Sequence, residues 1–519
     1  MSLQGKKFGL CPYYASRSNI ENAEILCMPY VSLFHKPTRE KFGIDLKNSI
    51  IIIDEAHNLL ETITQINSFT LNFCQICQVY SQLKRYQEKY QKRLKAKNSY
   101  YVNQLCLFLN NVRNFLQTKH NNGKSGTYIS MKILDFLIEI NAAALDFTKL
   151  QAFVENSQLS KKLNMFIEKI QDMSVNITNE KTSTSTEIND ILRSPLNILD
   201  LFIDFFIGLM KTNDKESIFL IKFDEKLPET SINLLRLDSE NGLKDVLKEC
   251  HSMVLAGGTM EPISEYNFIK KQFPIDKYHT FSCGHIITPD QFKALVISKA
   301  KNSALDLLYN FENKKNDDLL TKTIEIIDEI AKEIPDGLII FLQSYGFLDS
   351  LASKMKILKI HEKMQGKRVF FDSKTATKIV SDYEKEIKSS KGALLFSVMG
   401  GRLSEGINFN DKLARGIIVL GLPFSNIKAP EIIEKSRFLE KRDVSYQENA
   451  CMKLINQTIG RAIRHKNDYA IVFLVDKRFE NAKIQEKLPG WIRGAVEGKL
   501  GVEEVLKKTR EFFKKVEKL

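Results

Sequence analysis

The sequence predicts an α/β protein in which two parallel-sheet lobes are separated along the chain by a long helical insertion. The first observation is the run Ile50–Ile53, four consecutive β-branched residues that are typical of a strand buried on both faces of a parallel sheet. The second is the region from about 60 to 225, where helical periodicity dominates and strand signals are few. The third is the alternation of strands and helices beyond about residue 280, which indicates a second parallel lobe.

The composition favours a multidomain protein that binds a polyanion. The chain has 519 residues, 43% of them hydrophobic, and a net charge of +13, which favours nucleic acid over a membrane as partner. Its eight cysteines are too scattered for a disulfide scaffold. The N-terminus lacks the apolar core of a signal peptide, and the most apolar helical run, 198–210, contains two aspartates and is too short to span a bilayer. We therefore expect an intracellular protein that does not enter a membrane.

The first lobe should contain two strands, Glu24–Met28 and Ile50–Ile53, around a helix at Tyr30–His35. Asp54 and Glu55 follow the second strand, at the edge where α/β folds bind ligands. In nucleotide hydrolases such an Asp holds Mg²⁺, and the next acid is free to orient water. An apolar strand that ends in two acids can also be no more than a core strand and a helix cap.

Long helices are expected at 61–117, 129–150 and 159–173. The segment from Lys84 to Lys97 carries seven basic residues against one Glu, with Tyr86 and Tyr90 between them. This mixture could follow a phosphate backbone and stack bases, although a solvated helix face is the commoner meaning. The candidate DNA-binding residues are Lys84, Arg85, Lys89, Lys92 and Arg93.

Two short patterns in the helical region are rejected as sites. Cys74 and Cys77 have the spacing of metal ligands, but no second Cys or His pair lies nearby in the sequence. Gly123-Lys124-Ser125 is similar to the end of a phosphate loop, but Thr118 stands where that loop needs glycine, and a helix precedes it.

Sheet character returns at Ser217–Phe223 and at Ser252–Ala256, which runs into Gly257-Gly258-Thr259-Met260. The glycines allow close backbone approach, and Thr259 can bridge two polar clusters. In the second lobe, strands are expected at 294–297, 337–342, 394–399, 416–420 and 470–475, with helices at 319–334 and 345–354, the latter capped by Ser344.

The last segment of interest begins at Gln457. On a helix, Gln457, Arg461 and Arg464 fall within about 60° of one another, and two guanidiniums with an amide suit a transferring phosphoryl group. Ile459 and Ile463 can pack inward beside this stripe. A surface salt-bridge stripe is the alternative interpretation.

In this order the segments resemble the motor motifs of superfamily-two DNA helicases, and more narrowly the iron–sulfur helicases of the XPD and FANCJ group. Details resemble the chromosome-loss, or ChlR-type, branch of that group. The resemblance covers nearly the whole chain. It is carried by Cys11-Pro12-Tyr13-Tyr14, Asp54-Glu55-Ala56-His57-Asn58-Leu59, Ala256-Gly257-Gly258-Thr259-Met260, Phe281-Ser282-Cys283-Gly284-His285, Ser404-Glu405-Gly406-Ile407-Asn408-Phe409, Gln457 to His465, and Lys487-Leu488-Pro489-Gly490-Trp491-Ile492.

The resemblance implies two RecA-like lobes with an inserted α-helical arch, the first lobe being incomplete. Residues 1–60 would form the C-terminal part of the first lobe with its acidic box, and residues 61–225 the arch. Residues 226–280 would return to the first lobe, and residues 281–519 would form the second.

The resemblance also implies roles for single residues. Asp54 would hold Mg²⁺, Glu55 would orient the attacking water, and His57 and Thr259 would couple the nucleotide to the DNA-binding surface.

Glu405 and Gly406 would lie near the nucleotide, across the cleft from the acidic box. Arg461 and Arg464 would act as arginine fingers, and Gln457 would contact the water or the His57 network.

The chain departs from the family at its N-terminal end. Family members carry a phosphate loop that ends in Gly-Lys-Thr/Ser far upstream of the acidic box, and none of the 53 residues before Asp54 forms it. Members bind a 4Fe–4S cluster with four cysteines, of which Cys11 matches only the last. The chain is therefore similar to a helicase cut just before this ligand, and by itself we expect it to have negligible ATPase activity and no stable cluster.

By resemblance, the function is that of an ATP-dependent DNA helicase with ATP and Mg²⁺ as cofactors. It would move along single-stranded DNA in the 5′→3′ direction and unwind forked DNA during replication, repair and sister-chromatid cohesion. The location would be nuclear, and replication or cohesion factors would be partners. Two alternatives stay open: a non-enzymatic module that binds DNA or a partner, and one half of a split helicase.

Overall fold

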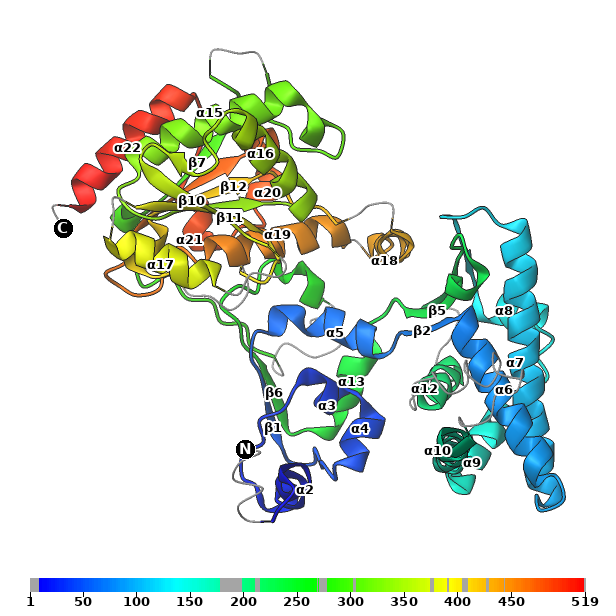
Figure 1. The fold of residues 1–519 in the computed structure, drawn as a ribbon. Helices are drawn as coiled ribbons and strands as arrows, with labels where there is room; N and C mark the ends of the chain where they lie inside the picture. Colours follow the sequence, from blue (N-terminus) through cyan, green and yellow to red (C-terminus); the bar gives the residue numbers. More distant parts are fainter. Residues whose placement is uncertain are drawn as a thin grey trace. The chain divides into compact units, whose positions relative to one another are not determined.

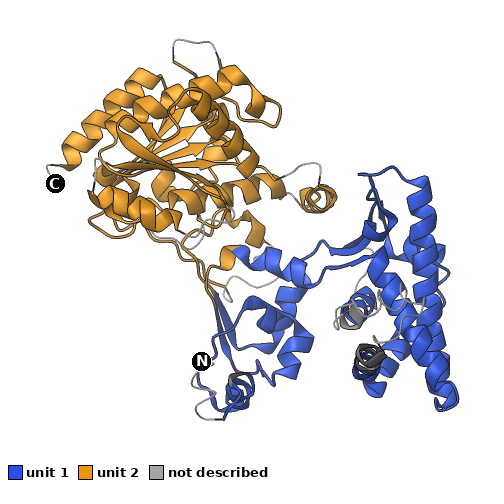
Figure 2. Cartoon of the chain, viewed as in Figure 1, with its two compact units in different colours: residues 1–52, 58–254 blue, residues 53–57, 255–519 orange. Residues whose placement is uncertain are grey.

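A computed structural model shows the chain as a mixed α/β protein, as predicted (Figure 1). It divides into two compact units: residues 1–52 with 58–254, and residues 53–57 with 255–519 (Figure 2). The predicted domain boundaries at 60, 225 and 280 stay a prediction. No helix in the described part of the chain is both long and apolar enough for a membrane span. The structure describes residues 9–177, 198–210, 215–267, 269, 278–301, 305–373, 378–389, 392–403, 409–425, 429–442 and 444–517.

One part of the first unit is built on strands β1 (Ile50–Ile53) and β6 (Ser252–Leu255), which pair with each other. Helix α3 (Tyr30–Phe34) forms as predicted. Two expectations were wrong. Residues 24–28 form no strand, since none of the described strands pairs with them to take up their backbone groups. Strand β1 is buried on one face only, because Ile50 and Ile52 are 65% and 70% exposed.

Around this sheet the first unit continues with α2 (Pro12–Ser18), α4 (Lys36–Lys41), α5 (Leu59–Ile66) and α13 (Glu240–Glu249). The rest of the unit is largely helical, as expected, and its helices share one apolar core. They are α6 (Phe73–Tyr90), α7 (Ala96–Asn122), α8 (Ile133–Glu139), α9 (Phe147–Ser157), α10 (Leu159–Ile177) and α12 (Ile198–Met210).

The same core contains a four-stranded antiparallel sheet, of which the predicted strand Ser217–Phe223 is confirmed and the other three strands were not predicted. Its order is β2 (Phe69–Asn72), β5 (Ser231–Arg236), β4 (Ser217–Lys222) and β3 (Tyr128–Met131). Strands β2 and β3 fall inside stretches that we expected to be helical. They are four residues long and pair with strands far along the chain, so local periodicity carries little sign of them.

The second unit contains an eight-stranded sheet that is parallel except at one edge. Its order is β14 (Val496–Leu500), β7 (Phe292–Ile297), β13 (Ala470–Val475), β12 (Gly416–Leu420), β8 (Leu338–Leu342), β11 (Ala393–Val398), β10 (Lys367–Phe371) and β9 (Lys363–Met364), and only the β9–β10 pair is antiparallel. All five predicted strands of this lobe are confirmed. Their continuous apolar runs match burial on both faces.

Helices cover both faces of this sheet (Figure 1). One face packs against α15 (Asp317–Glu333), α16 (Tyr345–Ile357) and α22 (Val502–Val516). The other packs against α17 (Ile379–Ser389), α19 (Tyr446–Ile459), α20 (Ala482–Gln485) and α21 (Gly490–Arg493). The predicted cap of α16 is confirmed, because the hydroxyl of Ser344 accepts a hydrogen bond from the Phe347 amide at 3.3 Å.

Candidate nucleotide and coupling site

The acidic box forms a turn at the end of β1 that presents its two carboxylates to solvent. Glu55 adopts a left-handed backbone conformation with φ of 49°, and its amide donates to Asp54 Oδ1 at 3.0 Å. Asp54 and Glu55 are exposed, whereas Ala56 and His57 are buried. Exposed carboxylate oxygens that follow a strand are suitable Mg²⁺ ligands, so Asp54 fits the predicted cation site.

His57 connects this turn to helix α19. Its Nδ1 lies 3.2 Å from Glu55 Oε2, and its Nε2 contacts the side-chain amide nitrogen of Gln457. Burial lowers the pKa of His57, opposed by the charge of Glu55 and assisted by that of Lys453. A neutral ring with its proton on Nδ1 can accept a hydrogen bond from Gln457 at Nε2. The buried Nδ1 lies close to Glu55 but makes no hydrogen bond of good geometry.

The Gly-Gly-Thr segment lies against the acidic box and the end of α19. The amide of Ala56 donates to the carbonyl of Ala256 at 2.8 Å. A Cβ on Gly257 would lie 2.9 Å from Met260 Sδ and 3.6 Å from the Ala56 amide nitrogen, so the backbone of this segment lies close to the acidic box. A Cβ on Gly460 would lie 3.9 Å from Thr259 Cγ2, which places Thr259 beside the segment that contains Gln457.

Sequence reasoning missed three residues that hold the turn. Tyr266 donates its hydroxyl to the carbonyl of Ala56. The Lys453 ammonium donates to the carbonyl of His57 at 3.2 Å and pairs with Glu265. Lys453 precedes Gln457 by four residues and so shares its helix face, a spacing that could have identified it.

The two candidate arginine fingers are not on a helix, which corrects the prediction. Helix α19 ends at Ile459 with Gly460 as its C-cap, because glycine is a poor helix former, and Arg461 and Arg464 lie in the following loop. The pKa of Arg464 is lowered, first by partial burial and then by the charge of Arg461, with Asp468 and Glu55 acting in the opposite direction. Arg464 is thus within electrostatic reach of Glu55. The two isoleucines predicted to pack inward are both buried: Ile459 and Ile463.

Glu405 and Gly406, the other two residues predicted near the nucleotide, lie outside the described residues.

The structure of the basic segment corrects the expectation that its tyrosines could stack bases. Tyr86 is 8% exposed, and its ring centroid lies 5.7 Å from that of Phe166, inside the core of the first unit. Tyr90 packs on the same phenyl ring at 5.9 Å. These tyrosines are therefore committed to the core rather than presented for base stacking. The candidate DNA-binding residues remain partly or fully exposed: Lys84, Arg85, Lys89, Lys92 and Arg93.

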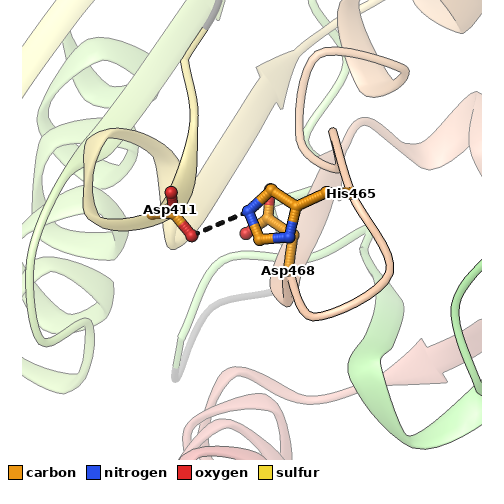
Figure 3. A group of neighbouring side chains, drawn as sticks. All are labelled: Asp411, His465 and Asp468. Atoms are coloured by element: carbon orange, nitrogen blue, oxygen red, sulfur yellow. Dashed lines mark hydrogen bonds and ion pairs between the residues drawn. The ribbon is translucent and has the colours of Figure 1, made fainter.

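The described cysteines do not fit an iron–sulfur cluster. Cys11 is exposed at the N-cap of α2. Within the described ranges, one group of three neighbouring side chains has ligand atoms close enough to hold a metal ion, and it contains no cysteine. The group consists of Asp411, His465 and Asp468 (Figure 3).

Known families match two parts of this chain, and known proteins match nearly all of it. The Helicase C-terminal domain family matches residues 327–495, and the DEAD_2 family matches residues 1–76. The ATP-dependent DNA helicase CHL1 of Scheffersomyces stipitis is 33% identical over 98% of this chain and 61% of its own length. The protein of that name in Aspergillus clavatus is 32% identical over 95% of this chain and 70% of its own length.

A solved XPD helicase structure shares the fold, with a TM-score of 0.51 and 16% identity over 95% of this chain and 76% of that one. The chain spans about three fifths of the length of most of the relatives that it matches. Identity at this level over nearly the whole chain, together with the shared fold, establishes the relationship. The chain belongs to the family of the CHL1 and DDX11 DNA helicases.

Proposed function

We propose that these residues form most of an ATP-dependent DNA helicase, which couples ATP hydrolysis to 5′→3′ movement along single-stranded DNA and to unwinding of forked duplexes. The observation that carries the proposal is the position of His57, whose neutral ring lies between the carboxylate of Glu55 and the amide of Gln457. His57 thereby connects Glu55, the acid that would orient water, to Gln457, which lies in the last helicase motif of the chain. Motion at one end of this connection changes the environment of the other.

The residues divide the work of hydrolysis among them. Asp54 would hold Mg²⁺, which supplies charge neutralisation for the phosphates when it is bound. The exposed carboxylate of Glu55 accepts a hydrogen bond from the attacking water and orients it. Arg464 interacts electrostatically with Glu55. It would stabilise the negative charge that develops on the transferring phosphoryl group. We assign Arg461 and, beyond the described residues, Glu405 and Gly406 to the same nucleotide site.

No residues ahead of Asp54 have the sequence of a phosphate loop. A segment outside these 519 residues would therefore supply the cradle for the β- and γ-phosphates.

DNA is the proposed substrate, because the relatives are named DNA helicases and the chain has a net charge of +13. The exposed cations between Lys84 and Arg93 would contact the phosphate backbone. A nuclear location, and replication or cohesion factors as partners, belong to the same proposal.

The test measures ATP hydrolysis and strand separation by a polypeptide in which a phosphate-loop segment precedes these residues. We expect hydrolysis to be stimulated by single-stranded DNA and to be lost in Glu55→Gln, with ATP binding retained. The 519 residues alone should bind DNA without hydrolysing ATP. If the extended polypeptide binds DNA but hydrolyses no ATP, the non-enzymatic binding module becomes the better interpretation.

A further inference from the structure

Asp468 is a buried carboxylate that holds the loop containing Arg464. Its exposed fraction is 0%. Oδ2 accepts a hydrogen bond from the Arg464 amide at 3.1 Å, and Oδ1 accepts one from the Tyr469 amide at 3.0 Å and one from Arg415 Nη1 at 2.8 Å. One side chain therefore joins the backbone of the candidate arginine finger to a buried cation.

Arg415 anchors this carboxylate to the sheet. It is 5% exposed and directly precedes β12, while Asp468 lies two residues before the neighbouring parallel strand β13. Nη1 of Arg415 also donates to the carbonyl of Tyr469 at 2.8 Å, and its guanidinium lies 3.8 Å from the centre of the Tyr469 ring. The pair is thus fixed to two central strands rather than to a surface loop.

Two further contacts restrain the same loop. His465 Nε2 lies 3.0 Å from Asp411 Oδ1. Figure 3 draws this contact as a dashed line. The side-chain amide of Gln291 donates to the carbonyl of Lys466 at 2.8 Å and to that of Asp468 at 3.0 Å. The loop after Arg464 is therefore held from three directions.

The group of Asp411, His465 and Asp468 has the composition of a metal site, but its charges are already matched. The Arg415 guanidinium lies 2.8 Å from the Asp468 carboxylate and 3.7 Å from that of Asp411. A metal ion between these carboxylates would face a buried positive charge, which is unfavourable where the dielectric constant is low. The contacts therefore favour an ion-pair network over a cation site.

We propose that Asp468 is a positioning residue for Arg464, supported by Arg415 and, on the outer side, by the Asp411–His465 pair. The catalytic consequence rests on the proposed function; the structural one does not. An arginine finger acts only where the charge develops, and a displacement of about 1 Å can cost about a hundredfold in rate. The network fixes the position of the Arg464 backbone through protein contacts alone.

The first experiment measures the backbone of the loop that contains Arg464 and does not depend on enzyme activity. Hydrogen exchange of the peptide containing Arg464 is measured in the 519-residue chain and in Asp468→Asn. We expect exchange at the Arg464 amide to rise about tenfold, because the variant loses a charge-assisted hydrogen bond. Unchanged exchange would overturn the inference, whatever the enzyme assays show.

The second experiment uses the phosphate-loop-containing helicase. Asp468→Asn should lower the DNA-stimulated kcat about tenfold or more while the KM for ATP stays within about twofold. The same substitution in an Arg464→Ala background should cost little more, because the residue that it positions is already absent. An equal loss of kcat in both backgrounds would show a merely structural role and would contradict the proposal.

A matched control and a second variant separate folding from positioning. Asp476 is equally buried and pairs with Arg478 at 2.8 Å after the end of β13, so Asp476→Asn should reduce stability but act additively with Arg464→Ala. If Asp468→Asn fails to fold because Arg415 is left unpaired, the neutral double variant Asp468→Asn with Arg415→Met removes both buried charges. It should fold and still show faster exchange at Arg464. If wild type lacks DNA-stimulated hydrolysis, the proposed function fails, and the exchange result alone decides this inference.

Discussion

The side-chain amide of Gln457 contacts the imidazole of His57 across a sequence separation of 400 residues. We expect Gln457→Ala to leave basal hydrolysis within about threefold of wild type and to remove most of the stimulation by single-stranded DNA, because it breaks the connection without touching Glu55. ATPase rates measured with and without DNA check this. Gln447→Ala, which changes the same residue type on the same helix, is the control and should keep its stimulation.

Glu55→Gln should abolish hydrolysis and spare nucleotide binding, because the amide keeps the volume and loses the charge that orients water.

Arg464→Ala should lower kcat about a thousandfold if it acts as an arginine finger. Combining the two should cost little beyond the worse single change, since both act on one transition state. A kcat near wild type for Arg464→Ala would remove this residue from the site.

The lowered pKa of His57 predicts a pH dependence of stability. The unfolded state binds the proton more readily than the folded state, so the contribution of the neutral ring is fully present above about pH 6.5 and is lost as the pH falls from there toward the folded-state pKa. Urea unfolding of wild type and His57→Gln between pH 7.5 and about 5.5 would show this as a difference in slope, since a Gln side chain does not titrate. Parallel curves for the two proteins would contradict it.

Charge reversal at Lys92 and Arg93 should weaken DNA binding and reduce the dependence of affinity on salt, because fewer counterions are released. Binding titrations at several salt concentrations measure both effects. Reversal at Lys507 and Lys514 on α22 changes the net charge by the same amount in the other unit and is the control. If the two double variants behave alike, the basic segment is not part of the binding site.

Five strands of the second unit were predictable because they are largely apolar runs between turn residues, whereas β9, β10 and β14 contain charged residues and were not predicted. Gly416–Leu420 and Ala470–Val475 match the expected bounds residue for residue. The acidic box and the Gln457 segment were also recognised from local sequence. The contact of His57 with Gln457 was expected from the family resemblance, whereas the role of Lys453, which lies about 400 positions from His57, required the structure.

Other expectations failed for physical reasons that local sequence does not report. The backbone that carries Arg461 and Arg464 follows a helix that stops at Gly460, and the buried Asp468 accepts a hydrogen bond from the Arg464 amide, so helical periodicity does not place these residues. Tyr86 is unavailable for base stacking because its ring packs against Phe166, which lies about 80 residues further along the chain.

The pairing of β2 with β5 has a consequence for biosynthesis. Leu71 lies opposite Ile232, so the two strands that flank the inserted helices hydrogen-bond to each other at their base. A ribosome releases Leu71 long before Ile232, and during that interval the helices can form locally while the sheet cannot. The insertion therefore closes only after its last strand has emerged, and until then the unpaired edge of β2 is open to chaperones and to wrong partners.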